Sequence, residues 1–234
     1  AHAYFEMVKR FGGVPLVTDV IPVQGTSDQL YRSRNSEKEI YDFIKNEMDE
    51  ISALLPSIPE ADGRITKWTA LALKSRAMLY AASVANFGSQ QLNGLLGFPI
   101  SEASSYYQAS LDASNQIIQS GAFSLYKKSD DPVKNFGDLF IDENNNSEVI
   151  FVEKYDYDAG KSHQWDALAQ PSGFGFNWSS NYTVYLETLE QFDFTDGATG
   201  KIDRSLYDDS TPIDPNRFFE QRDPRMRASI FYPG

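Results

Sequence analysis

The spacing of apolar residues in the first half of the chain predicts three long helices. The first begins at residues 36–39, Ser-Glu-Lys-Glu, which have the capping-box form in which the serine hydroxyl accepts from the glutamate amide. Apolar side chains then recur every three or four residues and end at two prolines, which cannot continue a helix. These positions are Ile40, Ile44, Met48, Ile51 and Leu55, followed by Pro56 and Pro59. The pattern predicts an amphipathic helix over 37–55.

Two further helices are predicted downstream, over 69–87 and 102–120. The first of these is rich in small residues, which allow a neighbouring helix to approach closely, so its sequence indicates a buried position. Its pattern-forming residues are Ala70, Ala72, Leu73, Ala77, Tyr80, Ala81 and Val84. The second is followed by Gly121, which is suited to the left-handed conformation that ends many helices. Its apolar face consists of Tyr107, Leu111 and Ile118.

These helices begin at nearly equal intervals, near residues 37, 69 and 102, which is compatible with a repeat array of helix pairs. Much of each interval is loop, so the periodicity alone supports only helices stacked antiparallel. The second half of the chain is richer in Tyr, Phe, Asp, Asn and Gly and has short strand-like runs and one short helical run. Strands are expected at 123–127, 148–155 and 228–232, and the helix at 183–191 with Asn181 near its cap.

Together these elements predict a mainly α protein. A helical scaffold is predicted over 1–121, and a loop-rich lobe with short strands and a short helix over 122–234, as two parts of one domain. The chain starts with helical spacing and stops directly after a strand-like run. We therefore interpret it as an internal piece of a longer protein.

Composition removes several classes of function. The 234 residues include 33 Asp plus Glu against 21 Lys plus Arg, a formal net charge of −12, which opposes binding to nucleic acid or to an anionic membrane surface. Cysteine is absent and imidazole comes only from His2 and His163, which excludes cysteine nucleophiles and zinc–cysteine sites. No window approaches the roughly 18 consecutive apolar residues of a membrane-spanning helix. Phosphate-binding glycine loops, Gly-x-Ser-x-Gly and His-Glu-x-x-His are absent too, so no cofactor, metal or catalytic residue is predicted.

Two motifs could indicate chemistry, and we interpret both as structural. Residues 142–153 place acidic and amide side chains at EF-hand positions one, three, five and twelve, but Ser147 stands where the sharp turn needs glycine. Residues 222–225, Arg-Asp-Pro-Arg, read as a turn, because Asp before Pro starts turns and the flanking arginines can hold it. Hydrolysis of a glycosidic bond needs two facing carboxylates, and the sequence marks no such pair.

A further set of motifs runs in order along nearly the whole chain. Residues 10–17, Arg-Phe-Gly-Gly-Val-Pro-Leu-Val, follow the first helical segment, and the Arg-Asp-Pro-Arg motif at 222–225 lies near the other end. Between them lie matching segments at 34–36, 41–44, 54–56, 63–67, 79–83, 148–151 and 192–197. In this order the motifs resemble the RagB/SusD family, which comprises surface glycan-binding proteins of Bacteroidetes.

That resemblance implies a fold of tetratricopeptide-like helix pairs and a function without catalysis. Family members capture oligosaccharides or glycans at the cell surface and deliver them to a SusC-like TonB-dependent transporter. The implied location is the outer membrane, with membrane attachment only through a lipid anchor outside this piece of chain. Two alternatives stay open: a glycoside hydrolase or lyase, and a helical-repeat scaffold that binds protein.

Residues 155–185 are the densest supply of the groups that bind sugar, namely flat aromatic faces beside amides and carboxylates. Their glycines indicate a loop, in which the rings either form a stacking platform or fill the core beneath it. The net negative charge favours a neutral glycan over a polyanionic one. A weaker candidate is the loop over 88–97. As ligand-binding residues we predict Trp165 and Trp178, which have polar neighbours on both sides, and then Tyr157 and Asn181.

Overall fold

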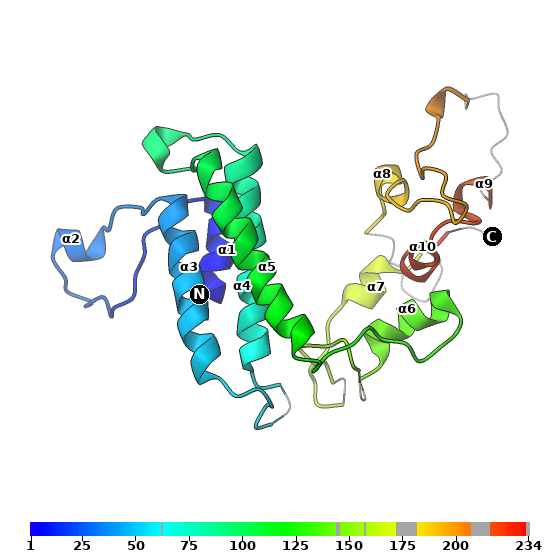
Figure 1. Cartoon of the computed structure of the whole chain (residues 1–234), viewed down its shortest axis with the longest axis horizontal. Helices are drawn as coiled ribbons and strands as arrows, with labels where there is room; N and C mark the ends of the chain where they lie inside the picture. Colours follow the sequence, from blue (N-terminus) through cyan, green and yellow to red (C-terminus); the bar gives the residue numbers. More distant parts are fainter. Residues whose placement is uncertain (62, 144–145, 157, 172–181, 207–215, 233–234) are drawn as a thin grey trace. The chain divides into compact units, whose positions relative to one another are not determined.

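The computed structural model describes residues 1–61, 63–143, 146–156, 158–171, 182–206 and 216–232. The chain packs as two compact units (Figure 1). The first comprises Ala1–Ser124 with Val149–Glu153, and the second comprises Leu125–Glu148 with Lys154–Gly234. The boundary predicted after residue 121 stays a prediction, and the return of 149–153 to the first unit has no counterpart in the sequence pattern.

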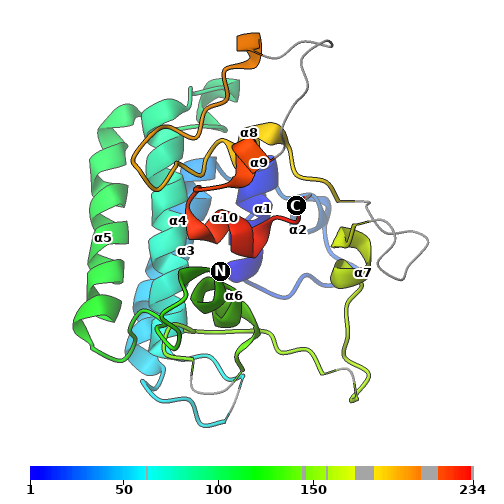
Figure 2. The ribbon, with the colours of Figure 1, turned by 90° about the vertical axis from the view of Figure 1, so that its right-hand side faces the viewer.

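The first unit is a stack of antiparallel helices. Figures 1 and 2 show the three long helices side by side, each running opposite to its neighbour. All three were predicted, and their ends differ from the predicted ones by no more than two residues. The helices are α1 (His2–Phe11), α2 (Ser27–Leu30), α3 (Glu37–Leu54), α4 (Lys67–Phe87) and α5 (Ala103–Gln119), with 3-10 turns η1 (Leu92–Gly94) and η2 (Ile100–Glu102) before α5.

Local sequence signals set the ends of these helices. The Ser36 hydroxyl accepts from the Glu39 backbone N–H at 3.2 Å, and the Glu39 carboxylate accepts from the Ser36 N–H at 2.7 Å, which confirms the capping box. The bond from the Ser36 backbone N–H to the Glu39 carboxylate lowers the pKa of Glu39 most, and a bond from the Ser36 hydroxyl to the same carboxylate at 2.9 Å lowers it further. After α5, Gly121 adopts φ +64°, the left-handed conformation expected of it.

Small residues let α4 lie close to its neighbours. Ala77, Ala81 and Ala82 are fully buried, and the Ser75 hydroxyl of α4 hydrogen-bonds the Ser114 hydroxyl of α5 at 2.7 Å. The apolar face of α3 is buried beside them, as predicted. On α5 the packing face is made of small residues with one tyrosine, and the face with Tyr107, Leu111 and Ile118 is exposed. Close backbone approach, not large side chains, therefore joins α4 to α5.

Helices and loops also make up the second unit. The predicted short helix is present but shortened to α8, and α6 was not predicted, although Asp131 caps it and Pro132 occupies its first turn. The elements are α6 (Pro132–Ile141), α7 (Trp165–Ala169), α8 (Leu186–Leu189), η3 (Arg204–Leu206), α9 (Asn216–Phe219) and α10 (Pro224–Ser229). The mainly α fold class is confirmed.

None of the three runs predicted as strands is a strand. In the part of the chain that the structure describes, β pairing is limited to isolated bridges. The backbone N–H of Tyr126 donates to the Glu148 carboxylate at 2.9 Å and not to a neighbouring strand. At 228–232 the run begins inside α10, whose cap is Asp223. The strand-like composition of these three runs therefore does not produce strands, because no partner strand among the described residues pairs with them.

Arg222 holds the loops of the second unit together. Its side chain is buried, and its guanidinium donates to the carbonyl oxygens of Phe192 at 2.6 Å and Gly200 at 2.9 Å. It also donates to the Phe218 carbonyl and lies over the Phe194 ring, 4.4 Å from its centroid. The structural interpretation of the Arg-Asp-Pro-Arg motif is confirmed.

No helix in the described residues combines the length and apolar character needed to cross a bilayer.

Candidate functional site

A cavity of about 960 Å³ lies within the second unit and is walled by three separate stretches of chain. Its volume falls in the range of small-ligand pockets, roughly 300–1,000 Å³. α7 with the residues after it forms one wall, residues 182–189 form the second, and the chain around α9 and after α10 forms the third. The aromatic side chains in the described lining are Trp165, Tyr182, Tyr185, Phe219 and Phe231.

Trp165 and Tyr182 form a stacked pair in this cavity. Their ring centroids are 4.7 Å apart and their planes differ by 25°. Neither ring is buried: 58% of Trp165 and 50% of Tyr182 is exposed. For these two rings the structure therefore decides between the open alternatives in favour of an accessible aromatic surface. Such a surface can pack against the apolar face of a ring-shaped ligand.

A short hairpin positions Trp165. Asp156 and Lys161 exchange backbone hydrogen bonds of 2.7 and 2.8 Å and so close the hairpin. His163 follows it and meets the Tyr155 ring edge-on, with centroids 4.6 Å apart. The His163 Nδ1 accepts from the backbone N–H of Trp165 at 3.2 Å. The backbone of Trp165 is thus fixed at the first residue of α7, and its indole stacks on Tyr182.

α8 is anchored beneath the second wall. Leu189 is buried, and the next residue, Glu190, is buried as well. The Glu190 carboxylate accepts from the backbone N–H of Ile202 at 3.1 Å and from Arg204 at 2.7 Å. Burial raises the pKa of Glu190, but the bonds from Ile202 and Arg204 outweigh it, so the pKa lies below its ordinary value. These bonds stabilise the charged Glu190 carboxylate beneath the second wall. The neighbouring residue that faces the cavity is the apolar Leu189.

The third wall is fixed from the end of the described chain. The Phe219 ring stacks on Tyr232 with centroids 4.6 Å apart and planes 18° apart, whereas Phe231, which also lines the cavity, is largely exposed. α10 precedes this segment and is capped by Asp223, whose carboxylate accepts from the Arg225 backbone N–H at 2.9 Å. The Arg225 side chain lowers the pKa of Asp223 by a direct hydrogen bond.

The chemistry that this cavity offers is stacking and neutral hydrogen bonding. Its described lining contains no Asp, Glu, Lys or Arg. The polar groups there are the amide of Gln170, the hydroxyls of Thr183 and Ser229, and the phenols of Tyr182 and Tyr185. This set can orient a hydroxyl-rich ligand, but it supplies no pair of carboxylates for hydrolysis.

Of the residues predicted from the sequence to bind ligand, Trp165 lies in this cavity. Trp178, Tyr157 and Asn181 lie outside the described residues. The sequence analysis did not single out Phe219 or Phe231, because both are more than thirty positions from the aromatic-rich stretch and no local pattern connects them to it. Only the tertiary structure brings them to Trp165.

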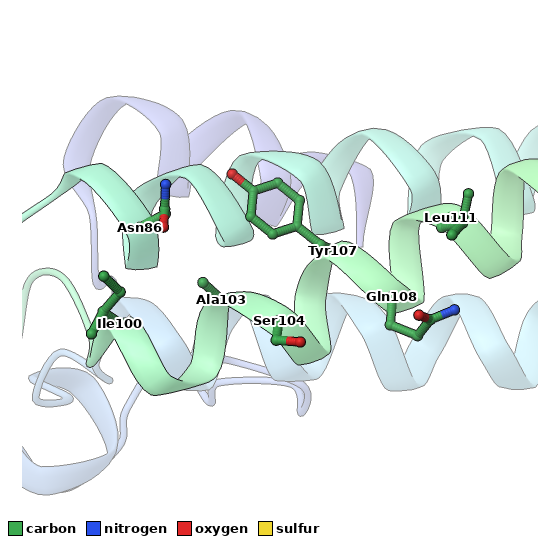
Figure 3. A pocket seen from close by; sticks show the side chains of 7 residues that line it. All are labelled: Asn86, Ile100, Ala103, Ser104, Tyr107, Gln108 and Leu111. Carbon is green, nitrogen blue, oxygen red and sulfur yellow. The ribbon is translucent and has the colours of Figure 1, made fainter.

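A second, smaller hollow of about 420 Å³ lies on the first unit, between the end of α4 and the start of α5. Figure 3 shows Tyr107 and Leu111 of α5 with Ile100 and Asn86 around it. The loop over 88–97, the weaker candidate, lies close by and is held to the helices. The Glu37 carboxylate accepts from its Gly97 N–H at 2.7 Å.

No metal site is found among the described residues, where groups of three or more His, Cys, Asp or Glu do not occur in ligating arrangement. Side chains of the EF-hand-like run, residues 142–153, make hydrogen bonds at the end of α6. The Asn146 amide donates to the Leu139 carbonyl at 2.8 Å, and the Asp142 carboxylate accepts from the Tyr126 hydroxyl at 2.8 Å. Burial and this bond raise the pKa of Tyr126 to about 12.

Comparison with known proteins identifies similar folds. No family model and no curated protein matches the chain. Two crystal structures from Bacteroides fragilis do: a SusD-like protein with TM-score 0.65, and a SusD-like carbohydrate-binding protein with TM-score 0.67. The chain has a SusD-like fold. The resemblance suggested by the sequence motifs is confirmed at the level of the fold.

This SusD-like fold is shared at low sequence identity and over part of the larger proteins. Identity is 24% with the first structure and 20% with the second. The matches include 96% and 100% of this chain but only 40% and 38% of the two crystallised chains. The chain thus corresponds to well under half of the SusD-like proteins it resembles.

Proposed function

We propose that this chain binds oligosaccharide in the aromatic cavity of its second unit. The observation that carries the proposal is the exposed Trp165–Tyr182 stack. The apolar face of a sugar ring packs on such a surface, while amide and hydroxyl groups such as those of Gln170 and Thr183 hydrogen-bond its hydroxyls. The fold supports the proposal, since one of the two similar structures is described as a carbohydrate-binding protein.

We propose further that the chain does not cleave the glycan. Glycosidases place two carboxyl groups on either side of the scissile bond, about 5 to 9.5 Å apart. The described lining of the cavity contains no carboxylate, which favours binding over the alternative of a hydrolase. Unchanged chain length of a glycan after prolonged incubation with the purified protein is the expected result, and steady release of shorter products would contradict it.

Location and partner follow from the same proposal. A protein that captures a glycan without breaking it needs an acceptor, and the family resemblance makes that acceptor a SusC-like TonB-dependent transporter in the outer membrane. Attachment would come from a lipid anchor outside this piece of chain. Co-purification of the full-length protein with such a transporter from outer membranes tests this part, and its absence from that fraction would refute it.

The binding site is tested by calorimetric titration against a panel of oligosaccharides. We expect Trp165→Ala and Tyr182→Ala each to weaken binding of a recognised glycan about tenfold, equivalent to about 1.4 kcal/mol. The matched control is Tyr31→Ala, which removes an exposed ring from the first unit and leaves affinity unchanged. Absence of binding across the panel, or full affinity in both cavity variants with native circular dichroism, would remove this site.

A further inference from the structure

The described lining of the aromatic cavity contains no charged side chain, although the chain as a whole is strongly charged. Asp, Glu, Lys and Arg make up 23% of all residues, and the formal net charge is −12. The described lining of the first two walls consists of Trp165, residues 169–171, residues 182–186 and Leu189, none of which is charged. The described part of the third wall adds only Phe219 and residues 229–231, which are uncharged too.

Several charged residues that lie close to the cavity in sequence are paired with other residues in the structure. Glu187 and Glu190 of the second wall both bind Arg204, which lies outside the lining. At the third wall, Arg225 pairs with Asp223 at the start of α10. These groups therefore compensate one another, and the described lining offers neither a cation for an anionic ligand nor an anion for a cationic one.

The absence of a compensating charge decides which ligands the cavity tolerates. A carboxylate or sulfate placed against Trp165 and Leu189 loses part of its hydration and gains no guanidinium or ammonium in return. The surrounding negative charge adds repulsion to that loss. An uncharged sugar ring meets neither cost, because its apolar face stacks on the Trp165–Tyr182 pair and its hydroxyls find amide and hydroxyl partners.

Resting on the proposed function, we infer that the cavity selects uncharged saccharides and rejects glycans that carry uronate or sulfate groups. Neutral hexoses and N-acetylated or esterified sugars are the accepted class. The described lining disfavours an anionic ligand because it provides no cationic side chain to compensate the ligand's charge. Selectivity between charged and uncharged forms of one backbone is therefore a property of the described lining.

The inference is tested with pairs of oligosaccharides that share a backbone and differ in charge. Suitable pairs are methyl-esterified and de-esterified oligogalacturonides, and plain and sulfated cellohexaose. In each recognised pair we expect the uncharged member to bind at least about tenfold more tightly. We also expect its affinity to stay constant between low and high salt, since no ion pair is formed.

Failure of the inference and failure of the proposed function give different results. Equal or tighter binding of the charged members, weakened by Trp165→Ala, overturns the charge selectivity and leaves glycan binding intact. Absence of binding to every member of every pair overturns the proposed function, and the inference with it.

A variant that installs the missing charge gives a second, independent readout. Thr183→Lys places an ammonium in the second wall, and we expect it to narrow the difference between esterified and de-esterified oligogalacturonide by several-fold at low salt. Gln116→Lys on the exposed side of α5 makes the same change in net charge outside the cavity and should alter nothing. An unchanged ratio in Thr183→Lys, with native circular dichroism, contradicts the inference.

Discussion

Arg222 shows how much of the second unit depends on one residue. Its guanidinium satisfies several backbone carbonyls in a region without strands, and these include the carbonyls of Phe192 and Gly200. Arg222→Ala leaves those buried acceptors unpaired, so we expect a loss of about 3 kcal/mol in the free energy of unfolding, measured by urea denaturation. Arg225→Ala, which removes an exposed ion pair next door, should cost less than about 1 kcal/mol. Equal losses in the two variants would contradict this role.

Single residues also mark the limit of prediction for the candidate site. Trp165 could be found from the sequence because polar neighbours on both sides indicate an exposed indole, and it is exposed. Phe219 and Phe231 resemble any core phenylalanine, and nothing nearby in the sequence relates them to Trp165. Their contribution to the cavity depends on the fold of the intervening chain. The sequence around a residue therefore indicates its role when the contacting residues are nearby in the chain. It does not indicate the role when the contacting residues are distant in the chain.

Helix caps contribute to the stability of individual helices. The capping box of α3 allows this contribution to be measured. Ser36→Ala removes the acceptor of the Glu39 N–H, and we expect it to lower the free energy of unfolding by about 1 kcal/mol. Ser52→Ala, at a partly exposed position near the other end of α3, is the control and should change stability little, since alanine favours helix. A native urea midpoint for Ser36→Ala would show that packing alone sets the start of α3.

Elements with complete local signals were predictable, and those that need a partner were not. α3 has a cap, a regular apolar face and a terminating proline, and its predicted range is right to within a residue at its ends. The run at 148–155 has the composition of a strand, but strands are stabilised by neighbours that this part of the chain does not provide. α6 was overlooked although Asp131 and Pro132 form a recognisable start. The local sequence signal for α6 is therefore present, although the region was predicted to be loop.

For the whole molecule, the ordered motifs carried more information than periodicity did. The intervals between helix starts supported only antiparallel stacking, whereas the motifs pointed to a SusD-like fold, which the two Bacteroides fragilis structures confirm. The location of the cavity could not be predicted, because its three walls come from stretches that are separated in sequence. A loop-rich unit forms such a cavity through specific side-chain bonds to backbone, as at Arg222 and Glu190, which no periodic pattern encodes.

Ion-paired carboxylates in both units make the stability of the whole chain sensitive to acid. Hydrogen bonds from Lys9 and Arg10 lower the pKa of Glu6 from its ordinary 4.5 to about 2, and Arg225 lowers the pKa of Asp223. A carboxyl whose pKa is lower in the folded state stabilises the fold above its unfolded-state pKa, and this contribution disappears as pH falls toward the folded-state value. We therefore expect the urea midpoint to be constant from pH 7 to 5 and to fall steadily from pH 4.5 towards 2. Glu6→Gln should flatten the lower part of that decline, and an unchanged pH profile in the variant would contradict the assignment.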